Sequence, residues 1–409
     1  MSRDRTDAII RWLDAQRDAE TRFLAELVKV PSDNPPGDCA PHAARAAALL
    51  EELGFAVERH TVPDTLVRAN GMASATNLIV RRRFGPGPMV ALNAHGDVVP
   101  PGEGWSVDPY GAAIRDGWMY GRGVAVSKSD FATYAFALKA LEAAGQARGT
   151  VELHFTYDEE AGGAIGPAWL LSENLTRPDF AISAGFSYAI TTAHNGCLHL
   201  EVAVKGKSAH AARPETGHDA LAAATGILAA LYAVRPELAR IVSKTPGIGS
   251  PNLTIGLIKG GINTNVVPDL VTFRLDRRII PEENPAAVES ALRARIAEAA
   301  AGFAGIAIDV RRILLAEPLV PRAGAERLVS AIQRQARAIL GEDIAAEGVP
   351  LYTDARHYSA AGIPTVLYGA GPRSLLEANA HRADERLKLD DLFKATKIVA
   401  LALGDLLDG

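Results

Sequence analysis

The feature that most constrains the fold is a change of pattern along the chain. Before residue 196, short apolar runs bounded by Gly and Pro alternate with Ala- and Leu-rich segments, as strands alternate with helices. Between residues 196 and 312 the order becomes strand, helix, strand, strand, helix, strand, and the alternation then resumes. Alternation predicts a mostly parallel sheet covered on both faces, and the middle block is typical of a ferredoxin-like layer. We therefore expect an α/β domain that is interrupted by an inserted ferredoxin-like α+β domain.

The boundaries of these domains follow from the same pattern. We expect residues 1–195 and 313–409 to form the α/β domain and residues 196–312 to form the insertion. A chain of 409 residues exceeds what one hydrophobic core usually serves, so two domains are expected on length as well. The expected elements of the α/β domain are strands at 76–80, 89–94, 151–157 and 365–368 and helices at 40–54, 131–144, 325–340 and 389–407. Those of the insertion are strands at 198–204, 253–258, 267–275 and 306–313 and helices at 219–234 and 285–301.

Composition excludes several classes of protein. A net charge of -5 and a pI near 6.1 give no electrostatic footprint for nucleic acid. Cys39 and Cys197 are too few for a disulfide framework or a cysteine-rich zinc site. The charged start of the chain lacks the apolar core of a signal peptide, and no window approaches the roughly 18 apolar residues of a membrane span. We expect a cytoplasmic protein with no nucleic-acid or membrane partner.

Two polar clusters directly follow expected strands, where the chemistry of such sheets gathers. In His95-Gly96-Asp97, the histidine could bind a metal while the carboxylate holds its other ring N–H. In the cluster Asp158–Glu160, one carboxylate could ligate a metal while its neighbour takes a proton from a bound water. Each cluster also has a simpler interpretation, because Asp97 could cap a turn and acidic residues favour the first turn of a helix.

Further candidates lie in the insertion and late in the chain. His210 follows an expected strand of the insertion and could reach another domain or subunit, where it would donate to a developing oxyanion. We expect that strand to lie at a sheet edge, and edges invite pairing with another chain. Alone, His210 would be only a surface histidine. The late cluster comprises the run Thr353–Arg356 and His381.

Taken together and in this order, the motifs resemble those of a family of zinc aminoacylases and carboxypeptidases. The family includes acetylornithine deacetylase, succinyl-diaminopimelate desuccinylase, aminoacylase and glutamate carboxypeptidase, and the resemblance covers nearly the whole chain. The matching motifs are His95 to Pro100, Trp105 with Asp108-Pro109, Tyr120 to Gly123, Asp158 to Glu160, Gly206 to His210, Asn265 with Pro268, Asp276 with Arg278, Thr353 to Arg356, and His381.

The resemblance implies roles at the ends of the strands. His95 would be a ligand of one zinc, and Asp97 would hold its ring. Glu159 would be the general base that activates water, while Glu160 and His381 would be ligands of the other zinc. The implied reaction is hydrolysis of an amide or related C–N bond in a small carboxylate-bearing substrate.

The resemblance also implies roles in the insertion, which in this family is a lid that commonly mediates dimerisation. His210 would stabilise the tetrahedral intermediate, often from the partner subunit of a homodimer. Asn265, Arg278 and Arg356 would hold the substrate carboxylate, since guanidinium pairs with carboxylate bidentately.

Two positions depart from the family pattern. The family has a metal-bridging aspartate where this chain has Val126, and a Glu or Asp ligand where it has Gly185. Two adjacent zinc ions need a bridging anion to screen their repulsion, and neither residue offers one. An ordinary two-zinc site is therefore not expected. If the backbone follows that of the family, Val126→Asp together with Gly185→Glu would restore the second site.

Three arrangements remain open. In the first, one zinc is held by His95, Glu160 and His381, with an open position for water. In the second, Asp130 replaces the lost bridge. In the third, no catalytic metal binds, and Glu159, Asp97 and His210 serve metal-free acid–base chemistry or binding alone. We expect the first, a hydrolase with one zinc per chain; the alternatives are a metal-free lyase or isomerase and a non-catalytic small-molecule binder.

Overall fold

The computed structural model describes residues 1–409 and contains two compact units. The first unit consists of Met1–Thr192, Pro321–Glu347 and Thr353–Gly409, and the second of Ala193–Val320 and Gly348–Tyr352. The second unit therefore extends beyond the expected range of 196–312. The two ends of its longer segment pair with each other, because the main-chain N–H of His194 donates to Leu319 O at 3.3 Å and that of Leu319 to His194 O at 3.1 Å.

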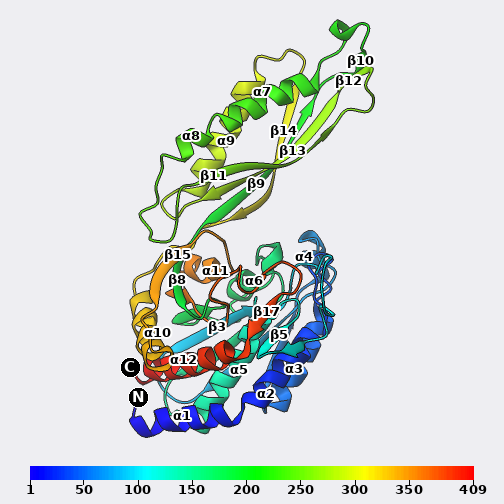
Figure 1. Cartoon of the computed structure of the whole chain (residues 1–409). Coiled ribbons are helices and arrows are strands. Elements are labelled where there is room, and N and C mark those ends of the chain that lie inside the picture. Colours follow the sequence, from blue (N-terminus) through cyan, green and yellow to red (C-terminus); the bar gives the residue numbers. More distant parts are fainter. The chain divides into compact units, whose positions relative to one another are not determined.

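An eight-stranded sheet forms the centre of the first unit (Figure 1). Its order is β1-β2-β6-β3-β7-β16-β8-β15. The bounds are β1 Val57–Thr61, β2 Thr76–Arg83, β3 Met89–His95, β6 Thr150–Thr156, β7 Phe180–Ser183, β8 Ala189–His194, β15 Ala345–Val349 and β16 Thr365–Leu367. The four central strands pair in parallel, whereas β1 pairs antiparallel with β2, β2 with β6, and β8 with β16. The α/β class with a large, mostly parallel sheet is confirmed.

Helices surround this sheet. They are α1 Arg3–Ala15, α2 Arg17–Val28, α3 Ala40–Glu52, α4 Asp64–Ala69, α5 Lys128–Ala143, α6 Pro167–Ser172, α10 Ala325–Leu340, α11 Ala355–Ala360 and α12 Leu389–Asp408. A short 3-10 turn, η1 Glu159–Ala161, follows β6. A small separate sheet has the order β17-β5-β4, with β4 Ala113–Arg115, β5 Trp118–Tyr120 and β17 Arg386–Lys388.

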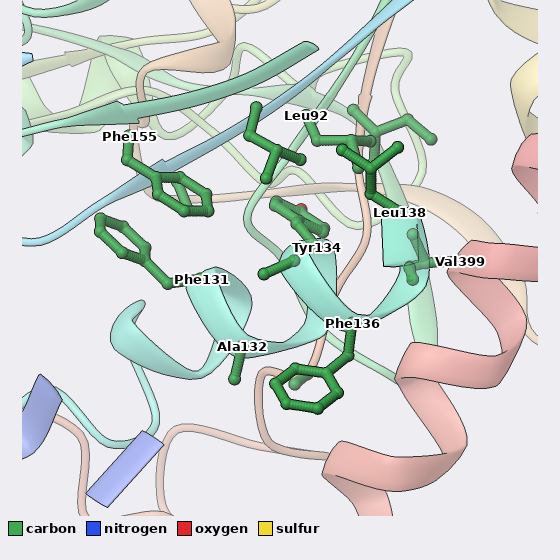
Figure 2. Close-up of a cluster of buried hydrophobic side chains, with 14 of the residues drawn as sticks. Leu92, Phe131, Ala132, Tyr134, Phe136, Leu138, Phe155 and Val399 are labelled. Carbon is green, nitrogen blue, oxygen red and sulfur yellow. The ribbon is translucent and has the colours of Figure 1, made fainter. Parts of the chain in front are cut away.

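Helix α5 explains why the middle of this unit is so apolar. Figure 2 shows it with Phe131 turned toward Phe155 of β6 and with Val399 of α12 near its other end. The rings of Phe131 and Phe155 stack with centroids 3.8 Å apart. A helix packed between a sheet and a second helix has no polar face, so its sequence shows little amphipathic periodicity. The first residues of α5 are thereby fixed beside the end of β3.

The second unit is a four-stranded antiparallel sheet of order β11-β13-β9-β14, with helices against it (Figure 1). Its elements are β9 Gly196–Lys205, β10 Ala209–His210, η2 Pro214–Thr216, α7 Ala220–Tyr232, α8 Arg235–Leu238, β11 Asn252–Gly260, β12 Val266–Val267, β13 Leu270–Ile279, α9 Pro285–Ala300 and β14 Ala307–Ala316. Leu200 and Val202 of β9 are buried, while the intervening Glu201 is partly exposed. This alternation is typical of a sheet with one covered face.

One expectation about this sheet is wrong. The strand before His210, β9, is internal, because it pairs with β13 on one side and β14 on the other. In the ferredoxin-like order the first strand is central, and the edges here are β11 and β14. Any strand pairing with a second chain would therefore involve one of those two strands.

The expectation about apolar windows also needs correction. The stretch Ala220–Leu238 is long and apolar enough to cross a membrane by length and composition, with a mean hydropathy of 1.3. It comprises α7 and α8 of the second unit. Ala223, Ile227 and Leu231 of α7 belong to the buried cluster between the helices and the sheet. These residues pack α7 onto the inserted unit, and 28% of the stretch is buried.

Candidate active site

The first candidate group forms the turn that ends β3. The ring Nδ1 of His95 lies 3.0 Å from the main-chain O of Asp97 and 3.4 Å from its carboxylate Oδ1. The main chain of His95 is held by Ser127, whose Oγ accepts from His95 N at 3.0 Å and donates to His95 O at 2.9 Å. The residue between His95 and Asp97 must be glycine, because a Cβ on Gly96 would lie 2.4 Å from the ring of Tyr157. The imidazole therefore has a fixed position and a fixed partner.

The carboxylate of Asp97 joins three segments of the chain. It is fully buried and accepts from Asn34 Nδ2 at 3.0 Å, from Glu159 N at 3.2 Å and from Glu160 N at 3.1 Å. Asp97 therefore also caps a turn, as the simpler interpretation predicted, and the turn is the one that contains Glu159 and Glu160. The sequence reasoning missed Asn34, because the run Asp33 to Gly37 indicates a turn but not the partner of that turn.

Glu159 lies on η1, immediately after β6, and its Oε2 is 3.9 Å from Nε2 of His95. Burial raises the pKa of Glu159 well above its usual value; the charges of Glu160, Asp354 and Asp97 add to the rise, while His95 opposes it. Burial disfavours a charged His95, yet Glu159, Asp97 and Glu160 raise its pKa well above the usual value. The neighbouring carboxylates thus favour the protonated imidazole of His95, and burial favours the protonated carboxyl group of Glu159.

Glu160 faces a different partner. Its Oε1 lies 3.6 Å from Nε2 of His381, on the segment between β16 and β17. The ion pair with Glu160 raises the pKa of His381 above its usual value. The side chain of His381 is exposed. Its φ of +61° is a backbone conformation that non-glycine residues rarely adopt. Glu160 and His381, predicted to share one metal, are thus adjacent.

Two further buried carboxylates lie behind Glu159. Burial raises the pKa of Asp354 to about 6, and it raises that of Asp158 well above the usual value, with the charge of Asp354 adding to it. The predicted substrate ligand Arg356 is itself buried and donates to the carbonyl oxygens of Gly162 and Thr353. Arg356 therefore supports the loop after η1. Its role toward substrate stays a prediction.

The residues present do not fit a two-metal centre. No group of three or more His, Cys, Asp or Glu side chains is arranged to hold a metal ion. Asp130, the candidate substitute for the lost bridge, is buried, and its Oδ1 accepts from Ala370 N at 2.7 Å, so this oxygen already has a partner. Burial raises the pKa of Asp130 to about 7. Nor are His95, Glu160 and His381 gathered into one three-ligand set.

Gly185 shows why one ligand is missing. A Cβ at this position would lie 2.7 Å from both the carbonyl carbon of Leu367 and the main-chain N of Tyr368. Real Cβ atoms do not approach main-chain atoms so closely, so β16 leaves no space for a side chain here. The expectation that Val126→Asp with Gly185→Glu restores a second metal site is therefore wrong for this backbone.

The remaining predicted residues belong to the second unit. His210 pairs with Val266 through β10 and β12, and Asn265 O accepts from Ala211 N at 3.0 Å, so His210 and Asn265 are neighbours. Arg278 lies at the far end of β13, with its Nε 3.1 Å from Oδ1 of Asp276. Arg278 therefore belongs to a different part of this unit from the neighbouring pair His210 and Asn265. Their roles in the reaction stay predictions.

Comparison with known proteins defines the class to which this fold and these motifs belong. The family model described as peptidase family M20/M25/M40 matches residues 91–405. The chain is 28% identical over 381 residues to succinyl-diaminopimelate desuccinylase of Rhizorhabdus wittichii, covering 90% of this chain and 92% of that protein. It is 28% identical over 373 residues to acetylornithine deacetylase of Myxococcus xanthus, covering 89% of this chain and 91% of that protein.

Solved structures agree at the level of the fold. The dipeptidase Dug1p of Saccharomyces cerevisiae superimposes with a TM-score of 0.80 at 15% identity, covering 100% of both chains. The M20 family metallo-carboxypeptidase Sso-CP2 of Sulfolobus solfataricus gives 0.78 at 19% identity, covering 94% of this chain and 98% of that one. The matching family consists of hydrolases that act on amide and peptide bonds. The chain belongs to peptidase family M20/M25/M40.

Proposed function

We propose that this chain hydrolyses the amide C–N bond of a small, carboxylate-bearing N-acyl amino acid or peptide, with Glu159 as the general base. The carrying observation is the largely buried Glu159 carboxylate, which follows β6 directly, lies 3.9 Å from Nε2 of His95 and has its pKa raised by burial. The relatives named as a desuccinylase and a deacetylase support an N-acyl substrate.

The chain's own residues supply the proton transfers. Glu159 takes a proton from water as the water oxygen bonds to the carbonyl carbon, and returns it to the nitrogen as the C–N bond breaks. The ring of His95, which Asp97 holds in place, lies beside Glu159 and would face the negative charge that develops there. In this proposal His210 donates to the oxyanion, while Asn265, Arg278 and Arg356 recognise the substrate carboxylate.

The metal content is part of the proposal. Family members are metal-dependent, and the zinc-binding set expected here was His95, Glu160 and His381. We propose at most one transition-metal ion per chain, because Val126 offers no ligand and Gly185 has no space for one. When bound, such an ion would polarise the carbonyl or the attacking water. The alternative to this proposal is a metal-free lyase or isomerase on a similar substrate.

The chain's assembly and its location in the cell are further parts of the proposal. A homodimer through the second unit is supported by edge strand β11, where Leu257 and Ile258 are exposed. Exposed apolar edge strands pair readily with other chains. The cytoplasm remains the proposed location.

Glu159→Gln tests the proposed function. The change is nearly isosteric but removes the proton acceptor, so we expect a loss of about 10²–10⁴-fold in kcat on whichever of N-succinyl-diaminopimelate, N-acetylornithine or dipeptides the wild type hydrolyses. Glu173→Gln, an exposed change near the end of α6, is the matched control. Wild-type kcat in Glu159→Gln would refute the assignment of the base. Inclusion of a chelator separates metal-dependent from metal-free turnover.

A further inference from the structure

The segment Pro31–Asp38, between α2 and α3, brackets the His95–Asp97 turn from one side. Ser32 Oγ donates to Gly96 O at 2.6 Å. Val98 N donates to Ser32 O at 3.0 Å, and Asn34 N donates to Val98 O at 2.8 Å. The two main-chain hydrogen bonds, which do not depend on the Ser32 side chain, fix the main chain of the segment against Val98, next to Asp97. The Asn34 side chain then has a defined position.

Besides the ring of His95, the side chain that contacts the Asp97 carboxylate is that of Asn34, because Glu159 and Glu160 donate through their main-chain N–H groups. Its amide Nδ2 donates to Asp97 Oδ2 at 3.0 Å, and its side chain is 7% exposed. The same oxygen accepts from Glu160 N, and the other oxygen from Glu159 N. Three donors from two segments thus set the plane of a carboxylate that also contacts His95. Loss of one donor frees that carboxylate to rotate.

From this arrangement we infer that Asn34 is a positioning residue for the reaction, acting through Asp97 on both His95 and Glu159. The inference rests on the proposed function for its catalytic consequence. Its structural content does not, because Asp97 would be held in the same way whatever the substrate. The positions of the base and of the imidazole depend on one buried carboxylate, and Asn34 orients it.

The test compares Asn34→Ala and Asn34→Asp with Ser32→Ala. Asn34→Asp is nearly isosteric but replaces the donor with a second carboxylate beside Asp97. If the alanine variant fails to fold, the aspartate variant tests the role of the Asn34 amide. Ser32→Ala removes a hydrogen bond from the same segment without touching the Asp97 carboxylate. For the Asn34 variants we expect kcat to fall by about 10²-fold with KM changed by less than about threefold, as misplacement of reacting groups predicts. Ser32→Ala should keep kcat within about threefold of wild type.

A second measurement does not need a substrate. Hydrogen–deuterium exchange followed by mass spectrometry on a peptide that contains Glu159 and Glu160 reports the two main-chain N–H groups that Asp97 accepts. We expect exchange there to accelerate by about tenfold in the Asn34 variants and to match wild type in Ser32→Ala. Asn34 variants with wild-type kcat, or with wild-type exchange at these amides, overturn the inference. A wild type inactive on every substrate of the panel would instead count against the proposed function, and the exchange result would still decide the role of Asn34.

Discussion

Glu20 gives a prediction whose magnitude follows from the structure. It lies on α2, is 1% exposed, and accepts from Thr396 Oγ1 of α12 at 2.5 Å. Burial raises the pKa of Glu20 to about 8 from a usual value of 4.5, although the hydrogen bond from Thr396 and the charges of Arg17 and Lys397 oppose the rise. At about 1.36 kcal/mol for each pKa unit, this difference corresponds to about 5 kcal/mol.

The sign follows from the order in which the two states ionise. Above a pH of about 4.5 the unfolded chain releases the proton of Glu20, whereas the folded protein keeps it until a pH of about 8. The stabilisation of the folded state by protonated Glu20 is therefore complete below a pH of about 4.5 and is lost as the pH rises through about 8. Glu20→Gln removes this ionisation and still offers Thr396 an acceptor. We expect the free energy of unfolding of the variant, relative to wild type, to rise by about 5 kcal/mol between about pH 4 and about pH 9.

The assay is urea denaturation followed by tryptophan fluorescence at several pH values. Trp12, Trp105, Trp118 and Trp169, the four tryptophans of the chain, all belong to the first unit, so the signal reports the unit that contains Glu20. Asp18→Asn, at an exposed position of α2, is the control for a charge change on the same helix. A relative stability that does not change with pH would refute the reasoning about buried Glu20.

Three shorter predictions follow. His381→Ala should lower zinc occupancy, because it removes one partner of the Glu160 pair, while His60→Ala should not; equal occupancy in both variants would contradict the assignment. Gly185→Ala should lower the free energy of unfolding by about 1–3 kcal/mol in calorimetry, because the new Cβ would collide with the main chain of β16. Gly249→Ala is the control, because a Cβ there has open space; equal losses of stability in the two variants would contradict the close contact at Gly185. Sedimentation at micromolar concentration should show a dimer, and a monomer alone would exclude a residue contributed by a partner subunit.

The sequence was informative wherever local pattern determines structure. The apolar run that became β3 placed His95 at a strand end, and the alternating residues of β9 identified a one-sided sheet. The same reasoning found α10 with its bounds unchanged, because that helix has a clear apolar stripe between two glycines. Positions that depend on an element's own periodicity could be predicted.

What could not be predicted depends on contacts between distant segments. The donor from Asn34 to Asp97 and the close approach of β16 to Gly185 leave no periodic trace in the sequence. Asp130 looked available as a ligand because it lies one helical turn beyond Val126, yet folding directs its carboxylate to Ala370 N. The resemblance gave the residue types of the site but not which of them lie together.

The measurement that tests the central claim most directly is elemental analysis of extensively desalted wild-type protein, paired with activity on the N-acyl amino acid panel. The account predicts hydrolytic activity with at most one equivalent of a transition metal per chain, because Val126 and Gly185 remove two ligands and no three-ligand group replaces them. Two equivalents of zinc in active protein would contradict it.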